Sequence, residues 1–119
     1  MLHVLLALAV IALVSCYLST LWGAPWAPTS LSTVDRMLKL AGAGPGKRVV
    51  DLGAGDGRIV IRAARRFGAQ ATGIEIDPLR CAFANAAIWL RGLRSQARVV
   101  HGNFFYHDLS QADVVTLYL

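Results

Sequence analysis

A glycine-rich turn behind a short apolar strand is the part of this sequence best suited to chemistry. Residues 49–58 read VVDLGAGDGR, so Asp51 is followed by Gly53, Gly55 and Gly57 at every second position. Glycine has no Cβ and accepts positive φ, so the chain can turn tightly there and bring bare backbone against a ligand. The pattern predicts a cofactor loop that ends a strand and opens a helix.

The charges of this turn bear on which cofactor it binds. A dinucleotide-binding turn has the pattern GxGxxG, but Arg58 stands where the third glycine belongs. Asp56 also places a negative charge where a diphosphate would meet the helix N-terminus. We therefore expect a cationic ligand. S-adenosylmethionine, which joins a sulfonium and an ammonium to adenosine, fits better than NAD, and a dehydrogenase is disfavoured.

Polar residues also follow the next two predicted strands. Glu75 lies near the end of a strand over residues 71–76, where a carboxylate can accept hydrogen bonds from both hydroxyls of a ribose. Asn103 follows a strand over residues 98–101, and its amide could bind an adenine edge or simply be a turn residue. Carboxyl ends of parallel strands meet at one edge of a sheet, so these residues are expected to share a site with the glycine turn.

Alternating strand and helix patterns must position these residues. Strands are expected over residues 48–52, 71–76, 98–101 and 112–119, and helices over residues 31–40, 57–67 and 78–90. This succession predicts an α/β fold: a Rossmann-like, doubly wound parallel sheet with right-handed crossovers. Only the first four strands of such a sheet are expected here.

The N-terminal segment differs in character from the rest. Residues 2–22 contain no charged side chain, and as a helix they would rise roughly 30 Å. We expect residues 1–23 to form a transmembrane anchor; a signal peptide, a lipoprotein box and a buried apolar helix are the alternatives. All 12 Lys and Arg follow it, which predicts a single-pass protein with its catalytic domain on the cytoplasmic side. Residues 24–46 form a connector and a helix, and residues 47–119 the cofactor-binding domain.

Composition argues against other kinds of site. Cys16 and Cys81 are far apart, and His101 and His107 have no ligand-spaced companion, so we expect neither a disulfide nor a metal site. The net charge is +5, but no basic run is interleaved with aromatic residues. We attribute this charge to anionic lipid headgroups and expect no nucleic-acid partner.

Three motifs resemble those of class I, seven-strand methyltransferases that use S-adenosylmethionine: VVDLGAGDGR, GIEIDP at residues 73–78 and GNFF at residues 102–105. More narrowly, PTS at residues 28–30 and ADVVTLYL at residues 112–119 resemble prokaryotic protein-lysine methyltransferases and their membrane-anchored mitochondrial relatives. The resemblance covers residues 25–119 and implies that the C-terminal half of the domain is missing. It implies cofactor contacts from Asp51, Gly53, Ala54, Gly55, Asp56, Gly57, Glu75, Ile76, Asn103 and Phe104.

A lysine acceptor would have to lose its proton before methylation, since its pKa in water is about 10.4. Thr116 and Tyr118, near the end of the last strand, could hold such an amine and are the candidate catalytic residues, although both are also ordinary strand residues. A protein-lysine substrate is expected; a lipid or small-molecule acceptor and a non-catalytic cofactor-binding module are the alternatives. The unpaired edge of the last strand predicts self-association or a partner chain.

Overall fold

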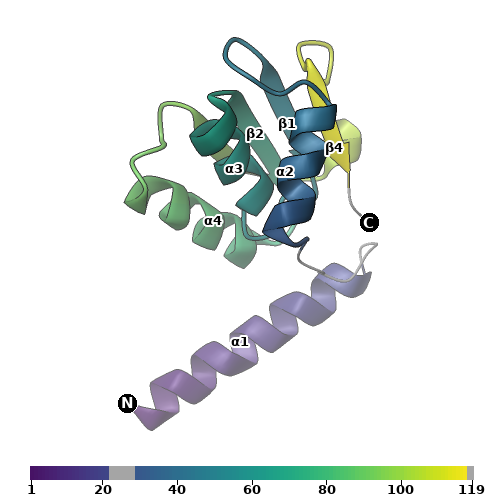
Figure 1. Cartoon of the computed structure of the whole chain (residues 1–119). Helices are drawn as coiled ribbons and strands as arrows, with labels where there is room; N and C mark the ends of the chain where they lie inside the picture. Colours follow the sequence, from purple (N-terminus) through teal and green to yellow (C-terminus); the bar gives the residue numbers. More distant parts are fainter. Residues whose placement is uncertain (22–28, 118–119) are drawn as a thin grey trace.

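The computed structural model describes residues 1–21 and 29–117, and four parallel strands form its central sheet (Figure 1). They lie in the order β3-β2-β1-β4, so β1 pairs with both β2 and β4. This confirms the predicted Rossmann-like α/β sheet, and the observed ends lie within two residues of the predicted ones wherever they are described. The strands are β1 (Arg48–Leu52), β2 (Gln70–Glu75), β3 (Ala97–His101) and β4 (Val114–Leu117).

Three helices pack with this sheet, and each begins at a residue suited to that position. They are α2 (Leu31–Leu40), α3 (Arg58–Phe67) and α4 (Pro78–Leu90). Ser30 caps α2, and Asp77 caps α4 ahead of a proline at its first position, as the sequence predicts. Helix α3 instead begins at Gly57 in the left-handed conformation, with φ of +80°. Gly57 has no side chain to cap the helix, and the carboxylate of the residue before it, Asp56, accepts a hydrogen bond from the Arg58 backbone N–H at 3.2 Å.

One buried core joins the helices to the sheet. Helix α3 contributes Val60 and Ala63, α2 covers it with Val34 and Leu38, and α4 adds Ile88. All five side chains are at most 1% exposed. Within each helix the buried residues recur three or four positions apart, which gathers them into one stripe and leaves the opposite face outside.

Helix α1 (Leu2–Leu21) forms where a helix was predicted, but the predicted membrane span is not supported. Among residues 1–21 and 29–117, no helix is both long enough and apolar enough to cross a bilayer. The large apolar side chains of α1 are exposed, so the alternative of a buried core helix is not supported either.

Two predicted features fall outside the described residues: the proline-containing connector at residues 24–28, and Tyr118. A short 3-10 helix, η1 (Phe104–Tyr106), follows β3 and was not predicted. Within the described residues β4 pairs with β1 alone. The remaining side of β4 is therefore an edge. Val115 and Leu117, which share one face of β4, are about half exposed.

Candidate functional site

The sheet register brings two predicted site residues into direct contact. Asp51 of β1 lies opposite Thr116 of β4, and the Thr116 hydroxyl donates a 2.7 Å hydrogen bond to Asp51 Oδ1. Both side chains are buried. Sequence reasoning assigned Thr116 to a substrate amine and Asp51 to the cofactor, and did not foresee that two residues 65 positions apart would meet in this contact. A direct contact of Thr116 with substrate stays a prediction.

The Asp51 carboxylate lies in surroundings that disfavour its charged form, unlike Asp56, whose pKa is lowered. The pKa of Asp51 is raised from 3.8 to about 6: burial is the largest cause, the hydrogen bond from Thr116 opposes it, and the nearby Glu75 and Asp56 carboxylates add to the rise. Its second oxygen, Oδ2, is buried and has no hydrogen-bond partner among the described residues. A buried carboxylate with one unpaired oxygen is stabilised by any cation that reaches it.

Glu75 is built into the glycine turn. Its Oε1 accepts a hydrogen bond from the Gly55 backbone N–H and its Oε2 accepts one from the Asp77 backbone N–H, both at 2.8 Å. These bonds tie the end of β2 to the turn after β1. Each carboxylate oxygen can accept a second hydrogen bond, so a contact with ribose hydroxyls remains open to it and stays a prediction.

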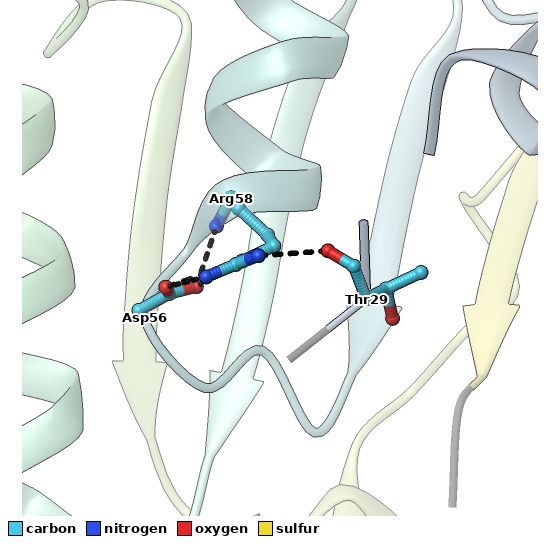
Figure 2. Close-up of polar contacts among 3 residues, drawn as sticks. All are labelled: Thr29, Asp56 and Arg58. Atoms are coloured by element: carbon cyan, nitrogen blue, oxygen red, sulfur yellow. Dashed lines mark hydrogen bonds and ion pairs between the residues drawn. The ribbon is translucent and has the colours of Figure 1, made fainter. Parts of the chain in front are cut away.

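Asp56 does not carry an uncompensated charge. Figure 2 shows the Arg58 guanidinium against this carboxylate, with Nη2 2.7 Å from Oδ2, while Nη1 donates to the Thr29 carbonyl oxygen at 2.8 Å. Burial raises the pKa of Asp56, but the hydrogen bonds from Arg58 outweigh it and the pKa is lowered. The argument that Asp56 itself selects a cationic cofactor is therefore weakened, and Asp51 is the stronger candidate for that role.

Asn103, after β3, is a turn residue, which was one of the two roles expected for it. Asn103 Oδ1 accepts a hydrogen bond from the Phe105 backbone N–H at 3.0 Å and so caps η1. The rings of Phe104 and Phe105 contact each other with centroids 4.7 Å apart and planes tilted by 41°. The amide nitrogen of Asn103 takes no part in that cap, so the predicted adenine contact is still chemically available.

An apolar cavity of about 600 Å³ lies between α1 and the carboxyl ends of β2 and β3. Ile76 and His101 line it from the sheet side, and Val10, Val14 and Leu18 line it from α1. In Figure 1, α1 runs below the sheet, at the end where the strands terminate. Of the predicted cofactor residues, Ile76 faces this cavity, whereas Asp51 and the glycine turn are not among its lining residues.

Gly73 is a residue of the site that sequence reasoning missed. A Cβ at this position of β2 would lie 2.5 Å from the Ala54 Cβ and 2.9 Å from a methyl group of Val60. Real Cβ atoms do not approach so closely, so Gly73 is what allows the cofactor turn and α3 to sit on β2. The signal available in the sequence was a glycine inside a strand, which often marks a close approach of another segment.

These residues fit a nucleoside that carries positive charge. Asp51 offers an unpaired buried oxygen, and a Cβ built on Gly53 would meet nothing within 4 Å, so the turn leaves space beside its backbone. The carboxylates of Asp51, Asp56 and Glu75 outnumber the one guanidinium of Arg58 in this cluster. In the part of the chain that the structure describes, no three His, Cys, Asp or Glu residues are grouped so as to hold a metal ion.

Comparison with known proteins decides the family. Residues 51–119 match the ANTKMT methyltransferase domain, a match over more than half of the chain. The chain belongs to this methyltransferase family. The predicted resemblance to class I methyltransferases, close to those that act on protein lysine, is thereby confirmed.

Individual relatives support this assignment. A protein-lysine N-methyltransferase of Saccharolobus islandicus is 45% identical over 96 residues, which cover 80% of this chain and 60% of that relative. The adenine nucleotide translocase lysine N-methyltransferase of Mus musculus is 38% identical over 68 residues, 57% of this chain and 29% of its own length. This member of the family thus spans less than two thirds of the length of either relative.

A solved structure supports the cofactor. The crystal structure of an RNA methyltransferase from Salinibacter ruber in complex with S-adenosyl-L-homocysteine matches with a TM-score of 0.76 and 47% identity, covering 78% of this chain and 61% of that one. S-adenosyl-L-homocysteine is what S-adenosylmethionine becomes once its methyl group is transferred. S-adenosylmethionine is therefore the cofactor of this methyltransferase domain, as the glycine turn predicts.

Proposed function

We propose that this chain belongs to an enzyme that transfers a methyl group from S-adenosylmethionine to lysine side chains of proteins. Binding of S-adenosylmethionine is supported above all by Asp51, a buried carboxylate with one unpaired oxygen beside a glycine turn. The lysine acceptor is supported by the relatives from Saccharolobus islandicus and Mus musculus, both named for lysine N-methylation.

The side chains of this site would act mainly by holding and aligning. S-adenosylmethionine supplies an electrophilic methyl group, and the transfer is an in-line displacement that needs alignment and exclusion of water. Asp51 would hold a positive group of the nucleoside, and Thr116 would fix the orientation of Asp51. Glu75 would hold the turn in shape through its bonds to Gly55 and Asp77.

Cofactor binding gives the first test. We expect calorimetry to show binding of S-adenosylmethionine and none of NAD. The affinity should rise as the pH passes about 6, because Asp51 must be ionised to attract a cation. Asp51→Asn should weaken binding about tenfold and remove this pH dependence. Tighter binding of NAD than of S-adenosylmethionine would contradict the proposal.

The acceptor needs a separate test, and one alternative has an observation in its favour. Because the Salinibacter ruber neighbour is described as an RNA methyltransferase, RNA must be offered beside protein and lipid. The chain is incubated with S-adenosylmethionine carrying a labelled methyl group and with a lysate, which is then separated into protein, RNA and organic extract. We expect label in protein, and as methyl-lysine after hydrolysis. Label in RNA or in the organic extract would replace the lysine proposal by the corresponding acceptor.

We also propose a location and an assembly for this enzyme. Exposed apolar side chains along α1 support a location at a membrane surface. The 12 Lys and Arg that follow α1 support the cytoplasmic side, because the cytoplasmic leaflet carries anionic lipids that attract basic residues. The edge of β4 supports association with a further strand, from a second copy or another chain. Flotation with liposomes and light scattering of the purified chain test the two statements.

A further inference from the structure

Helix α4 carries a second apolar face that the fold does not use. Cys81, Ala84 and Ile88 point into the core. At 100° per residue the opposite side of the helix collects another set at spacings of three and four. This outer face consists of Leu79, Ala82, Phe83, Ala86, Trp89 and Leu90, all of them exposed.

The exposure of this face is large for side chains of this type. Phe83 is 66% exposed, Trp89 60% and Leu90 75%. A single exposed apolar residue needs no explanation, but a contiguous stripe along a whole helix marks a surface that contacts something else. Helix α4 also sits at the β3 end of the sheet, against β2 and β3. Of its outer face, Leu79 lines a cavity shared with α1, and the residues from Ala82 to Leu90 are not among the residues that line it.

The charges around this face indicate the partner. Residues 78–107 contain four arginines and neither Asp nor Glu. Arg91 ends α4 and Arg94 lies in the turn that follows, and both are exposed. A stripe of apolar side chains bordered by arginines, with a tryptophan at its margin, matches an anionic lipid surface, which takes apolar groups below its headgroups and cations among them.

The surroundings of α4 extend the same surface. Pro78 and Leu79, at its start, line the apolar cavity that α1 closes from the other side with Val14 and Leu18. Exposed apolar side chains therefore continue from α4 towards α1, which has no charged residue along its described length.

We propose that the outer face of α4 docks on an anionic bilayer, with the helix lying in the plane of the membrane surface. Phe83, Trp89 and Leu90 enter the zone between headgroups and acyl chains, while Arg91 and Arg94 contact headgroup phosphates. This docking adds a contact to the membrane location proposed above and does not depend on the methyl-transfer site.

Trp89 provides a local readout. The full chain with Trp22→Phe and Trp26→Phe keeps Trp89 as its single tryptophan. It is mixed with vesicles of phosphatidylcholine and phosphatidylglycerol whose acyl chains are brominated near the headgroup. We expect quenching of Trp89 fluorescence, and the joint change Phe83→Ser with Leu90→Ser should lower the vesicle affinity by about a hundredfold.

Two further variants separate charge from apolar contact. Arg91→Gln with Arg94→Gln should weaken binding to anionic vesicles by about fivefold for each arginine and leave binding to neutral vesicles unchanged. Phe105→Ser is the matched control, because Phe105 is also an exposed phenylalanine, 79% exposed, but lies outside α4. It should bind as the parent does.

The outcomes are distinguishable. Vesicle binding without quenching of Trp89 would overturn docking by α4 and leave the membrane location standing. Absence of any binding would overturn both. A dimer in lipid-free solution that dissociates on Phe83→Ser with Leu90→Ser would show that this face holds a second copy of the chain, and would also overturn the lipid assignment.

Discussion

Replacing Asp51 by asparagine should change how stability depends on pH. In the folded state the pKa of Asp51 is about 6, against an ordinary value of 3.8. Between these two values the native protein binds more protons than the unfolded chain, so the free energy of unfolding falls as the pH rises and is level above about 6. At 1.36 kcal/mol per pH unit, the free energy of unfolding should fall by about 3 kcal/mol between pH 3.8 and pH 6.

Asparagine does not titrate, so this loss of stability should disappear in the Asp51→Asn protein. The asparagine amide oxygen can still accept the hydrogen bond from Thr116. Its NH2 group takes the place of the unpaired Oδ2, and burying a donor without a partner costs about 1–3 kcal/mol. The two effects nearly offset each other in absolute stability at pH 7. The informative quantity is therefore the change between pH 4 and pH 7, not the stability at one pH.

The measurement is urea unfolding of both proteins at half-unit steps from pH 4 to pH 7, without cofactor. Asp35 and Asp56 have lowered pKa values, so the stability they contribute is present above pH 4 and lost below it, equally in both proteins. Asp108→Asn, at an exposed carboxylate, should follow the parent over this range. Parallel curves for the parent and Asp51→Asn would refute the claim that Asp51 is buried at an electrostatic cost.

Three other substitutions test the surroundings of the site. Thr116→Val removes the only hydrogen bond shown to the Asp51 side chain within the described residues and should destabilise the fold by about 1–3 kcal/mol in urea unfolding, whereas Thr116→Ser should restore most of it. Gly73→Ala should lower the free energy of unfolding by about 1–3 kcal/mol, because its Cβ would overlap Ala54 of the cofactor turn. An unchanged urea midpoint would show that the turn moves to accommodate the methyl group. Arg58→Gln should cost about 1 kcal/mol, because it removes the ion pair with Asp56, while Arg65→Gln, at an exposed position of the same helix, should not.

The alternation of strands and helices along the chain, and the edge of the sheet where the site lies, could be predicted because local signals agree with the fold. β1 is apolar and ends in an acid and a glycine turn, and Asp77 with Pro78 is a strong start signal for α4. The rule that ligands bind at the carboxyl ends of parallel strands then placed Asp51 and Glu75 at one edge. Each of these inferences uses only neighbours in the sequence.

Contacts between distant segments could not be predicted in this way. The bond from Thr116 to Asp51 depends on β4 pairing beside β1, and the bond from Arg58 to the Thr29 carbonyl depends on where α2 packs. Nothing in the pattern of α3 distinguishes Arg58 from its other arginines. The transmembrane prediction for α1 depended on the absence of charge in residues 2–22, and the described residues do not support it.

The central place of β1 governs the order in which this protein can assemble on a ribosome. β1, β2 and β3 follow one another along the chain and can pair as they emerge, but β4 must return to the far side of β1. Until residue 116 has left the exit tunnel, the Asp51 carboxylate lies on an uncovered flank where water solvates it. The nascent domain therefore buries this charge only once β4 has paired with β1 and Thr116 has reached the carboxylate.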